Sequence, residues 1–208
     1  MMKKEEALKI IFECAKAYKE NLSDKRVLIL SASSSLKNVC ATEVEFVKGN
    51  FLHMTGVKFI NKPKIAPNAF FKLCVNQRLS SSMFDMAPDG TTELKLSILP
   101  SIVKKNMSAN MIGDYSGVRP CLITDKLVGN TSAIVGFRND KGGIYAPNTV
   151  LCEDIRTLTA NKQRILAIYQ KRIGSNKYEE RVYLAKGIDW GKIIYPLEYQ
   201  YLHPSQQD

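Results

Sequence analysis

From residue 109 onward the chain consists of short runs of β-branched and aromatic residues, separated by glycine, asparagine and proline. Runs of this kind predict short strands joined by turns. We expect four such strands, at 109–115, 120–124, 131–138 and 143–147. A hairpin should follow, pairing 164–172 with 178–186 across the turn that contains Gly174. The second half of the chain therefore predicts an antiparallel, meander-like β-sheet.

The first half of the chain has helical periodicity instead. In 3–20, apolar residues recur at helical spacing between lysines and glutamates, which predicts an amphipathic helix. We expect two strands at 26–31 and 42–47, and further helices at 65–79 and at 91–106, the last bent or restarted at Pro100. Together these elements predict an α+β fold, with N-terminal helices packed on a C-terminal antiparallel sheet.

No linker, repeat or low-complexity segment divides the chain. Its 208 residues are 45% hydrophobic and 24% charged, which is typical of a globular protein that folds by burying apolar side chains. We expect a single domain over 1–208, with 190–208 as a peripheral tail. No apolar run is long enough for a signal peptide or a membrane-spanning helix, so we expect a cytoplasmic protein without membrane association.

The five cysteines indicate a reducing compartment. Their number is odd, their spacing is wide and no two form a Cys-x-x-Cys pair, so neither a disulfide framework nor a zinc site is indicated. We expect each to be a small buried apolar residue. They are Cys14, Cys40, Cys74, Cys121 and Cys152.

The chain is strongly basic. Thirty lysines and arginines against twenty aspartates and glutamates give a net charge of +10, and the pI is near 9.3. Positive charge spread along the whole chain favours association with a nucleic acid or an acidic protein. Charge alone is weak support, because many basic proteins bind no anion specifically.

One of only two histidines, His53, lies in the sequence Phe-Leu-His-Met-Thr-Gly-Val over 51–57. An imidazole has an unperturbed pKa of about 6.5, so it can accept and donate a proton near neutral pH. On a basic protein this favours proton-transfer chemistry on a polyanion, with RNA the first candidate. The alternative is a histidine with a purely structural role in the core or at a helix end.

Several common catalytic motifs are absent from the sequence. It contains no phosphate-binding P-loop, no dinucleotide fingerprint, no His-Glu-x-x-His and no Gly-x-Ser-x-Gly. The acidic pairs Glu43/Glu45 and Glu153/Asp154 fit solvated surface better than a two-metal site. We therefore expect neither a metal ion nor a cofactor.

A set of short motifs occurs in a consistent order over roughly residues 43–189. They are Asn50–Gly56, Ala109–Tyr115 with Arg119-Pro120, Lys126–Asn130, Gly136-Phe137, Tyr145–Thr149, Glu153–Arg156 and Ala185–Gly187. In this set the chain resembles the phage-associated nuclease-like domains grouped with barnase, EndoU, colicin E5/D and RelE, in particular the fourth phage group.

This resemblance implies a small α+β nuclease-like fold, encoded by phage and other mobile elements and cleaving RNA. Barnase-like enzymes pair a carboxylate with a histidine, and EndoU-like enzymes pair two histidines. Here His203 lies outside the matched region, which puts a second catalytic histidine in doubt. The acid or base partner of His53 would then be a tyrosine, a lysine, an aspartate or absent.

Three residues form the expected catalytic set. His53 is the candidate base or acid. Arg119 would clamp the phosphate with two parallel hydrogen bonds, although a surface ion pair, for example with Asp114, explains it equally well. Tyr115 would orient phosphate or stack on a base, or it is simply a half-buried strand residue.

The expected substrate-binding residues are polar or basic. The hydroxyl and amide groups of Thr55, Asn130, Thr131, Asn148 and Thr149 suit phosphate, but they equally suit turns and strand caps. Lys58 adds phosphate attraction. Arg172 and Arg181 belong to a basic, tyrosine-containing hairpin that would bind single-stranded RNA, although its charges fall on both faces.

The sequence thus predicts a metal-independent, toxin-like endoribonuclease in which the 2′-hydroxyl of RNA attacks the phosphate. Its partners would be single-stranded or structured RNA and an antitoxin or other acidic protein. One alternative is a catalytically silent nucleic-acid-binding or phage accessory protein with the same fold. Another is a protein-interaction module, for example an inhibitor with a basic binding face.

Overall fold

Strand β1 (Lys25–Ala32) determines the architecture, because it is hydrogen-bonded along both of its edges. The computed structural model describes residues 2–33, 39–117 and 122–204. In it β1 pairs antiparallel with β2 (Val39–Phe46) on one side and with β7 (Thr159–Arg172) on the other. A short parallel pairing, at Val44 and Tyr145, joins β2 to β6 (Ile144–Leu151).

These pairings close the sheet into a ring. The strand order is β1, β2, β6, β5 (Ile134–Lys141), β4 (Lys126–Gly129), β3 (Met111–Tyr115) and β7, which returns to β1. β8 (Glu180–Leu184) pairs with β7 outside the ring. β7 is 14 residues long, so one part of it pairs with β1 and another with β3.

The expected fold class is therefore wrong. The chain forms a closed seven-stranded β-barrel, not an open meander with helices packed on it. Closure depends on β1 and β2, which lie in the half of the sequence that has helical periodicity. Local turn signals predict pairing between neighbouring strands, and they contain no information on the pairing of 25–32 with 164–172. Closure also removes the exposed edges that a meander would leave.

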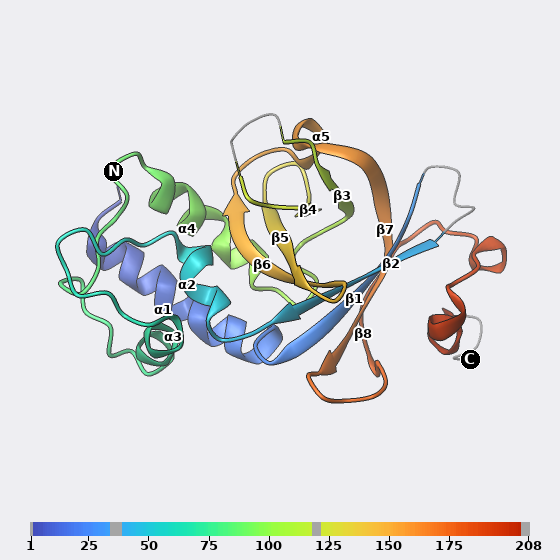
Figure 1. The fold of residues 1–208 in the computed structure, drawn as a ribbon, viewed down its shortest axis with the longest axis horizontal. Coiled ribbons are helices and arrows are strands. Elements are labelled where there is room, and N and C mark those ends of the chain that lie inside the picture. The colour runs from blue at the N-terminus through green and yellow to red at the C-terminus, as the bar shows by residue number, and fades with distance from the viewer. Residues whose placement is uncertain (1, 34–38, 118–121, 205–208) are drawn as a thin grey trace.

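The four longest α-helices gather at one end of the barrel (Figure 1). They are α1 (Lys4–Asn21), α2 (Asn50–Thr55), α3 (Pro67–Val75) and α4 (Thr91–Ile102), and their apolar faces share one core with the barrel interior. The rings of Tyr18, Phe51 and Phe71 meet there at centroid distances of 5.3–5.6 Å. None of the helices described is both long and apolar enough to cross a bilayer.

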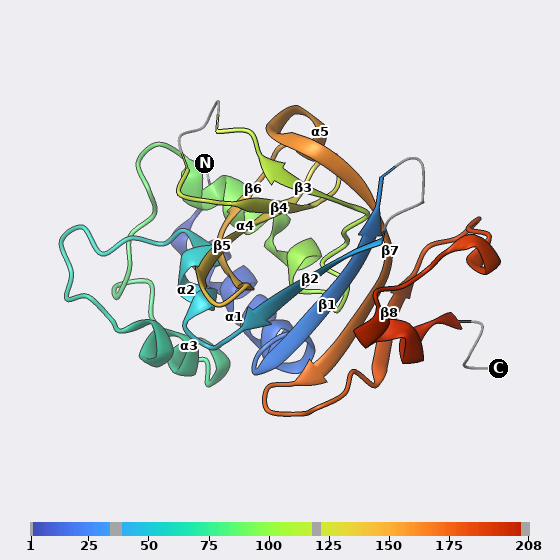
Figure 2. The same cartoon turned by 45° about the vertical axis from the view of Figure 1, so that its right-hand side comes forward.

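The C-terminal arm, residues 185–204, packs against the outside of the barrel (Figure 2). It contains the short helices η1 (Trp190–Lys192) and η2 (Leu197–Leu202). Its apolar residues cover outward-facing side chains of β1 and β7, including Leu28 and Tyr169. The Tyr169 hydroxyl donates a hydrogen bond of 2.7 Å to the Leu202 carbonyl oxygen, so the arm is integral to the fold.

Most of the expected elements are present, with shifted ends. The helices expected at 3–20, 65–79 and 91–106 correspond to α1, α3 and α4, and Pro100 lies within α4. The strand expected at 120–124 is wrong, because 122–124 are irregular and β4 begins at Lys126.

The expectation for the cysteines is only partly confirmed. Cys14 and Cys74 are buried, but Cys40 and Cys152 are exposed. Cys121 lies outside the described residues. The exposed pair occupies the ends of strands, where the chain leaves the apolar core.

We predict that Ile29→Ala lowers the free energy of unfolding by about 2–5 kcal/mol, because Ile29 is fully buried inside the strand that closes the barrel. Ile194→Ala is the matched control, since the Ile194 side chain is 73% exposed and should change stability by less than about 0.5 kcal/mol. Urea-induced unfolding measures both. Equal effects of the two substitutions would contradict the role assigned to β1.

Candidate nuclease site

His53 lies in the last turn of α2, a short helix that is fixed to the barrel. The Asn50 side-chain oxygen accepts a hydrogen bond of 2.8 Å from the Val47 backbone, and its amide donates to the Pro147 carbonyl of β6 at 3.1 Å. Phe51 and Met54 are fully buried, whereas His53 is exposed. The imidazole is therefore a surface group on a firmly held turn, and the buried-core alternative does not apply.

A lysine of α4 contacts this same turn. Lys95 Nζ lies 3.4 Å from the His53 carbonyl oxygen and donates a hydrogen bond of 3.1 Å to Thr149 Oγ1 on β6. Burial, together with the positive charge of Lys58, lowers the pKa of Lys95. Among the described residues, no carboxylate forms an ion pair with it. Within the described part of the chain, Lys95 is thus a half-buried cation without a carboxylate counter-ion.

Sequence reasoning did not identify Lys95. The available signal was a single lysine between Leu94 and Leu96 in an otherwise apolar run of α4. Such a lysine has two ordinary explanations, a surface position or a side chain that reaches from the core to water. The contact with Thr149, 54 residues further along the chain, places the Lys95 amine against β6, which no local pattern predicts.

Buried hydrogen bonds hold α4 against α2. The Thr92 hydroxyl donates to the Gly56 carbonyl oxygen at 2.7 Å and accepts from the Ala87 backbone at 2.8 Å. Thr92 is fully buried, so both bonds are shielded from water. Gly56 ends α2 with φ of 68°, and its Cα lies against the Lys95 stem. The chain turn after His53 therefore determines where Lys95 can lie.

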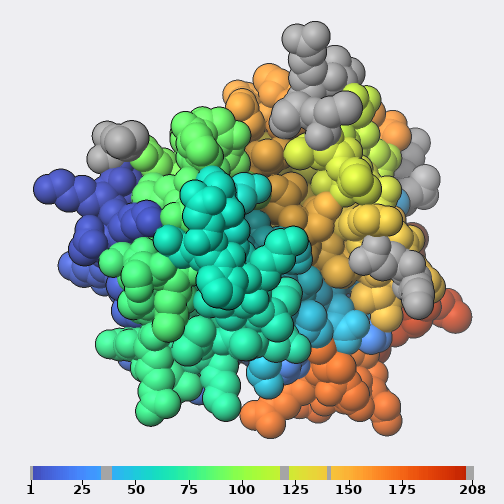
Figure 3. All heavy atoms as spheres, turned by 60° about the vertical axis from the view of Figure 1, so that its left-hand side comes forward, coloured from blue at the N-terminus to red at the C-terminus, as the bar shows by residue number. Residues whose placement is uncertain are grey.

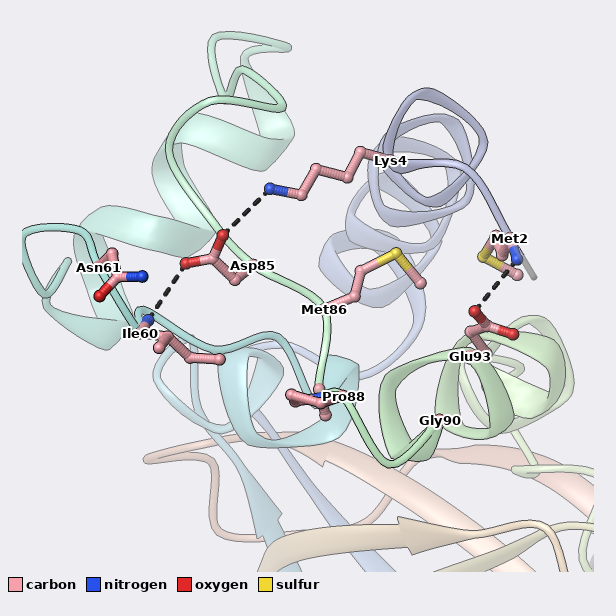
Figure 4. Close-up of a pocket in the computed structure, with 10 residues that line it drawn as sticks. Met2, Lys4, Ile60, Asn61, Asp85, Met86, Pro88, Gly90 and Glu93 are labelled. Carbon is pink, nitrogen blue, oxygen red and sulfur yellow. Dashed lines mark hydrogen bonds and ion pairs between the residues drawn. The ribbon is translucent and has the colours of Figure 1, made fainter.

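The segment that follows Gly56 lines a cavity of about 490 Å³ (Figure 4). Asp85 within it accepts hydrogen bonds from Lys4 Nζ at 3.1 Å and from the Ile60 backbone at 3.2 Å. The bond from Lys4 is the main cause that lowers the pKa of Asp85. The backbone of Lys58 pairs with that of Asp85, and the positive charge of the exposed Lys58 side chain helps to lower the pKa of Lys95.

Asn148 and Thr149 complete the arrangement from β6. Asn148 Oδ1 accepts a hydrogen bond of 3.1 Å from Thr124 Oγ1, and its amide donates to the Ile123 carbonyl oxygen at 2.5 Å. Gly136 on β5 leaves room for this packing, because a Cβ there would lie 2.8 Å from Thr149 Cγ2 and 3.0 Å from Thr124 Cγ2.

Segments that are far apart in the sequence thus form one surface. Figure 3 shows the residues after β2 lying between the α4 region and the strands of the barrel. We call this surface the His53–Lys95 face and define it by five residues: His53, Lys95 and Thr149, which the contacts of the Lys95 amine join, Asn148 next to Thr149 on β6, and Lys58, whose charge acts on Lys95. Four of the five were expected from the sequence.

The surroundings of three other expected residues indicate a structural role. Thr55 is buried, and its hydroxyl donates to the Leu52 carbonyl oxygen one turn earlier in α2. Asn130 Oδ1 accepts from the Ser132 and Ala133 backbone, which makes it the cap of a tight turn that also contains the exposed Thr131. These observations favour the turn-and-cap alternative.

The remaining expected residues lie elsewhere. Tyr115 packs with a small apolar cluster that includes Leu158 of α5 (Ile155–Leu158). Arg172 and Arg181 are exposed on β7 and β8, apart from α2 (Figures 1 and 2). Arg119 lies outside the described residues.

His203 belongs to the C-terminal arm. Its Nε2 lies 3.0 Å from the Ile193 carbonyl oxygen, and its ring packs against Trp190 and Tyr195. This environment holds the arm together. The part of the chain that the structure describes contains no group of three or more His, Cys, Asp or Glu side chains arranged to hold a metal ion.

The comparison with family models gives a match over residues 10–187, to the family described as phage-Barnase-EndoU-ColicinE5/D-RelE like nuclease4. The chain belongs to this nuclease family. The matched region contains every residue of the His53–Lys95 face and ends before η1. Searches of curated proteins and of solved structures found no match.

We predict that Gly56→Ala moves Lys95. A Cβ at Gly56 would lie 2.6 Å from Lys95 Cδ, and the flexible lysine stem is the group that yields. The amine then leaves Thr149, and the pKa of Lys95 rises towards its ordinary value, as NMR titration of labelled lysine would show.

Gly90→Ala is the matched control. Gly90 has a similar positive φ of 77°, but a Cβ there would meet nothing within 4 Å. Both substitutions should cost about 1 kcal/mol of stability through backbone strain, and only Gly56→Ala should change the pKa of Lys95. An unchanged pKa in Gly56→Ala would mean that the turn does not position the lysine.

Proposed function

We propose that this nuclease cleaves RNA at the His53–Lys95 face, by attack of the 2′-hydroxyl on the adjacent phosphate. The observation that carries the proposal is the ammonium of Lys95, half-buried, without a carboxylate partner among the described residues, and in contact with the turn that presents His53. Lys58 adds a second positive charge. A phosphodiester would supply the counter-ion that the residues described around Lys95 do not provide.

The chemistry needs a base, a cation and an acid. A base removes the 2′-hydroxyl proton while the 2′-oxygen bonds to phosphorus. Negative charge then grows on the phosphate oxygens, and the P–O5′ bond breaks as the 5′-oxygen takes up a proton. We assign one of the two proton transfers to His53 and the stabilisation of the growing charge to Lys95. The product carries a 2′,3′-cyclic phosphate.

Neighbouring groups suit substrate binding. The Thr149 hydroxyl already contacts the Lys95 amine, and Asn148 lies next to it on β6. Arg119 as a second phosphate clamp stays a prediction from the sequence. The net charge of +10 supports an anionic substrate, and Arg172 and Arg181 would extend RNA binding beyond the cleavage site. An acidic antitoxin is a partner consistent with the same charge.

We predict that His53→Ala lowers the rate of RNA cleavage by about 10²- to 10⁴-fold, because a positioned imidazole contributes that much to proton transfer. Gel analysis of a labelled RNA measures the rate, and end-group mapping should give 2′,3′-cyclic phosphates. EDTA should leave wild-type cleavage unchanged. Loss of activity in EDTA, with recovery on adding Mg²⁺, would overturn the mechanism.

His203→Ala is the control for that experiment. It removes the other histidine, whose surroundings lie in the C-terminal arm. Assayed at a temperature where circular dichroism shows both variants folded, it should retain the wild-type rate. If the two histidine variants behave alike, the loss reflects stability and His53 has no chemical role.

We predict that Lys95→Gln lowers cleavage by about 10²-fold or more while unfolding free energy at neutral pH stays within about 1 kcal/mol of wild type. The substitution removes a half-buried charge, which offsets the lost hydrogen bond to Thr149. A combined loss of activity and of several kcal/mol of stability would indicate a structural lysine.

The pH dependence of stability gives an independent check on Lys95. Its pKa is lowered in the folded state, so between that value and the ordinary lysine pKa the unfolded chain binds more protons. The contribution of Lys95 to the free energy of unfolding therefore rises as pH rises through this window. Buried tyrosines and cysteines with raised pKa values lower stability over the same alkaline range in both proteins. The contribution of Lys95 is therefore read as the difference between wild type and Lys95→Gln in urea unfolding, and this difference should change in favour of wild type as pH rises.

A further inference from the structure

The inward-facing rows of the barrel change from apolar to polar along the strands. On β2, Phe46 and Val44 point into the core, and Thr42 and Cys40 continue the same row. On β3 the row passes from Ile112 to Asp114, and on β4 from Val128 to Lys126. A cavity of about 300 Å³ opens at the polar end.

We call this cavity the barrel mouth. It is defined by the polar and aromatic side chains that line it: Cys40, Thr42, Asp114, Lys126, Tyr145, Asn161 and Gln163. None of them belongs to the His53–Lys95 face.

Its polar groups are organised by hydrogen bonds. Asp114 Oδ1 accepts from Lys126 Nζ at 2.6 Å, and Asp114 Oδ2 accepts from Asn161 Nδ2 at 3.0 Å. Gln163 accepts from the buried Ser31 hydroxyl at 2.7 Å. The carboxylate is thereby held in a fixed orientation, and each of its oxygens keeps lone-pair capacity for another donor.

The backbone of β7 is irregular at the rim of the barrel, where the Asn161 side chain points towards Asp114. Ile112 pairs with Gln163 but Asp114 pairs with Ala160, so β7 has extra residues at this point. Asn161 has φ of 47°, in the left-handed region. Bulges at barrel rims re-aim side chains and concentrate near functional sites, and strained backbone has the same association.

Among the described residues that line the mouth, the charges balance. Lys126 pairs with Asp114, and this hydrogen bond is the main cause that lowers the pKa of Asp114, so the carboxylate is ionised at neutral pH. A site of zero net charge with an acceptor at its centre does not favour phosphate. It favours a neutral ligand that donates hydrogen bonds. The half-buried Tyr145 ring, with Lys126 Nζ 5.8 Å from its centroid, adds an aromatic surface.

We propose that the barrel mouth binds an unpaired nucleobase that carries an exocyclic amino group. The base would stack against Tyr145 and donate its amino protons to Asp114, a pairing that carboxylates make with cytosine N4. A cavity of about 300 Å³ is at the small end of ligand sites, which suits a single base. This second site goes beyond the cleavage proposal and does not depend on it.

Cytidine and uridine are the probes, because they differ at C4 by an amino group against a carbonyl. Both lack a phosphate, so the lysines of the His53–Lys95 face do not recruit them, and failure here is distinguishable from failure of cleavage. We expect cytidine to bind about tenfold more tightly in NMR titrations, since one charge-assisted hydrogen bond is worth at least that factor. The largest chemical-shift changes should occur at residues of the barrel mouth.

Two variants separate the contributions. Asp114→Asn should abolish the preference for cytidine. Tyr145→Leu should lower the affinity for both nucleosides about tenfold and leave the preference for cytidine unchanged. Asp154→Asn is the matched control: Asp154 caps α5 and pairs with Arg156, and asparagine caps equally well, so binding should not change.

Three results would overturn the proposal: equal affinity of wild type for the two nucleosides, no shifts up to their solubility limit, or a cytidine preference that survives Asp114→Asn. Should Asp114→Asn fail to fold, Asn161→Gly replaces it, because glycine adopts the positive φ and removes the amide that holds Asp114. A reduced cytidine preference in that variant supports the site, and an unchanged one refutes it.

Discussion

The pairing of β1 with β7 is the interaction on which the rest of the structure depends. It joins residues 25–32 to 164–172 and turns a row of strands into a barrel. Closure gives the chain an interior that is apolar where the helices cover it and polar at the opposite mouth. It also fixes β6, against which α2 and α4 are held by Asn50 and Lys95. Both proposed sites are consequences of that ring.

The His53–Lys95 face and the barrel mouth differ in how their lysines are paired. At the His53–Lys95 face a lysine is half-buried without a carboxylate partner among the described residues, which disfavours its charged form and leaves it available for an anion. In the barrel mouth, Lys126 is neutralised by Asp114, so attraction for phosphate is cancelled and an oriented acceptor is left. On our two proposals, one site would contact the backbone of a nucleic acid and the other would contact its bases.

Sequence periodicity predicted individual helices and hairpins, but it did not predict contacts between segments that are far apart in the sequence. The α1 helix and the β7–β8 hairpin were predictable because their patterns lie within one or two dozen residues. The choice of His53 rests on the rarity of histidine in this chain and stays a prediction, whereas the hydrogen bonds of Asn130 favour its turn-capping alternative. The closure of the barrel and the contacts of Lys95 were not predictable. A strand pattern does not indicate which distant strand it pairs with, and the sequence around a lysine does not indicate which distant residues it contacts.

The C-terminal arm has a consequence for the order in which the protein matures during synthesis. Its residues are made after every strand of the barrel, yet they cover Leu28 and Leu30, which are among the first strand residues to be made. A nascent chain that ends before β7 has neither the ring nor the cover of its outer face. The barrel therefore matures only after β7 and the arm have been made, and chains truncated before them expose apolar strands that chaperones and proteases recognise.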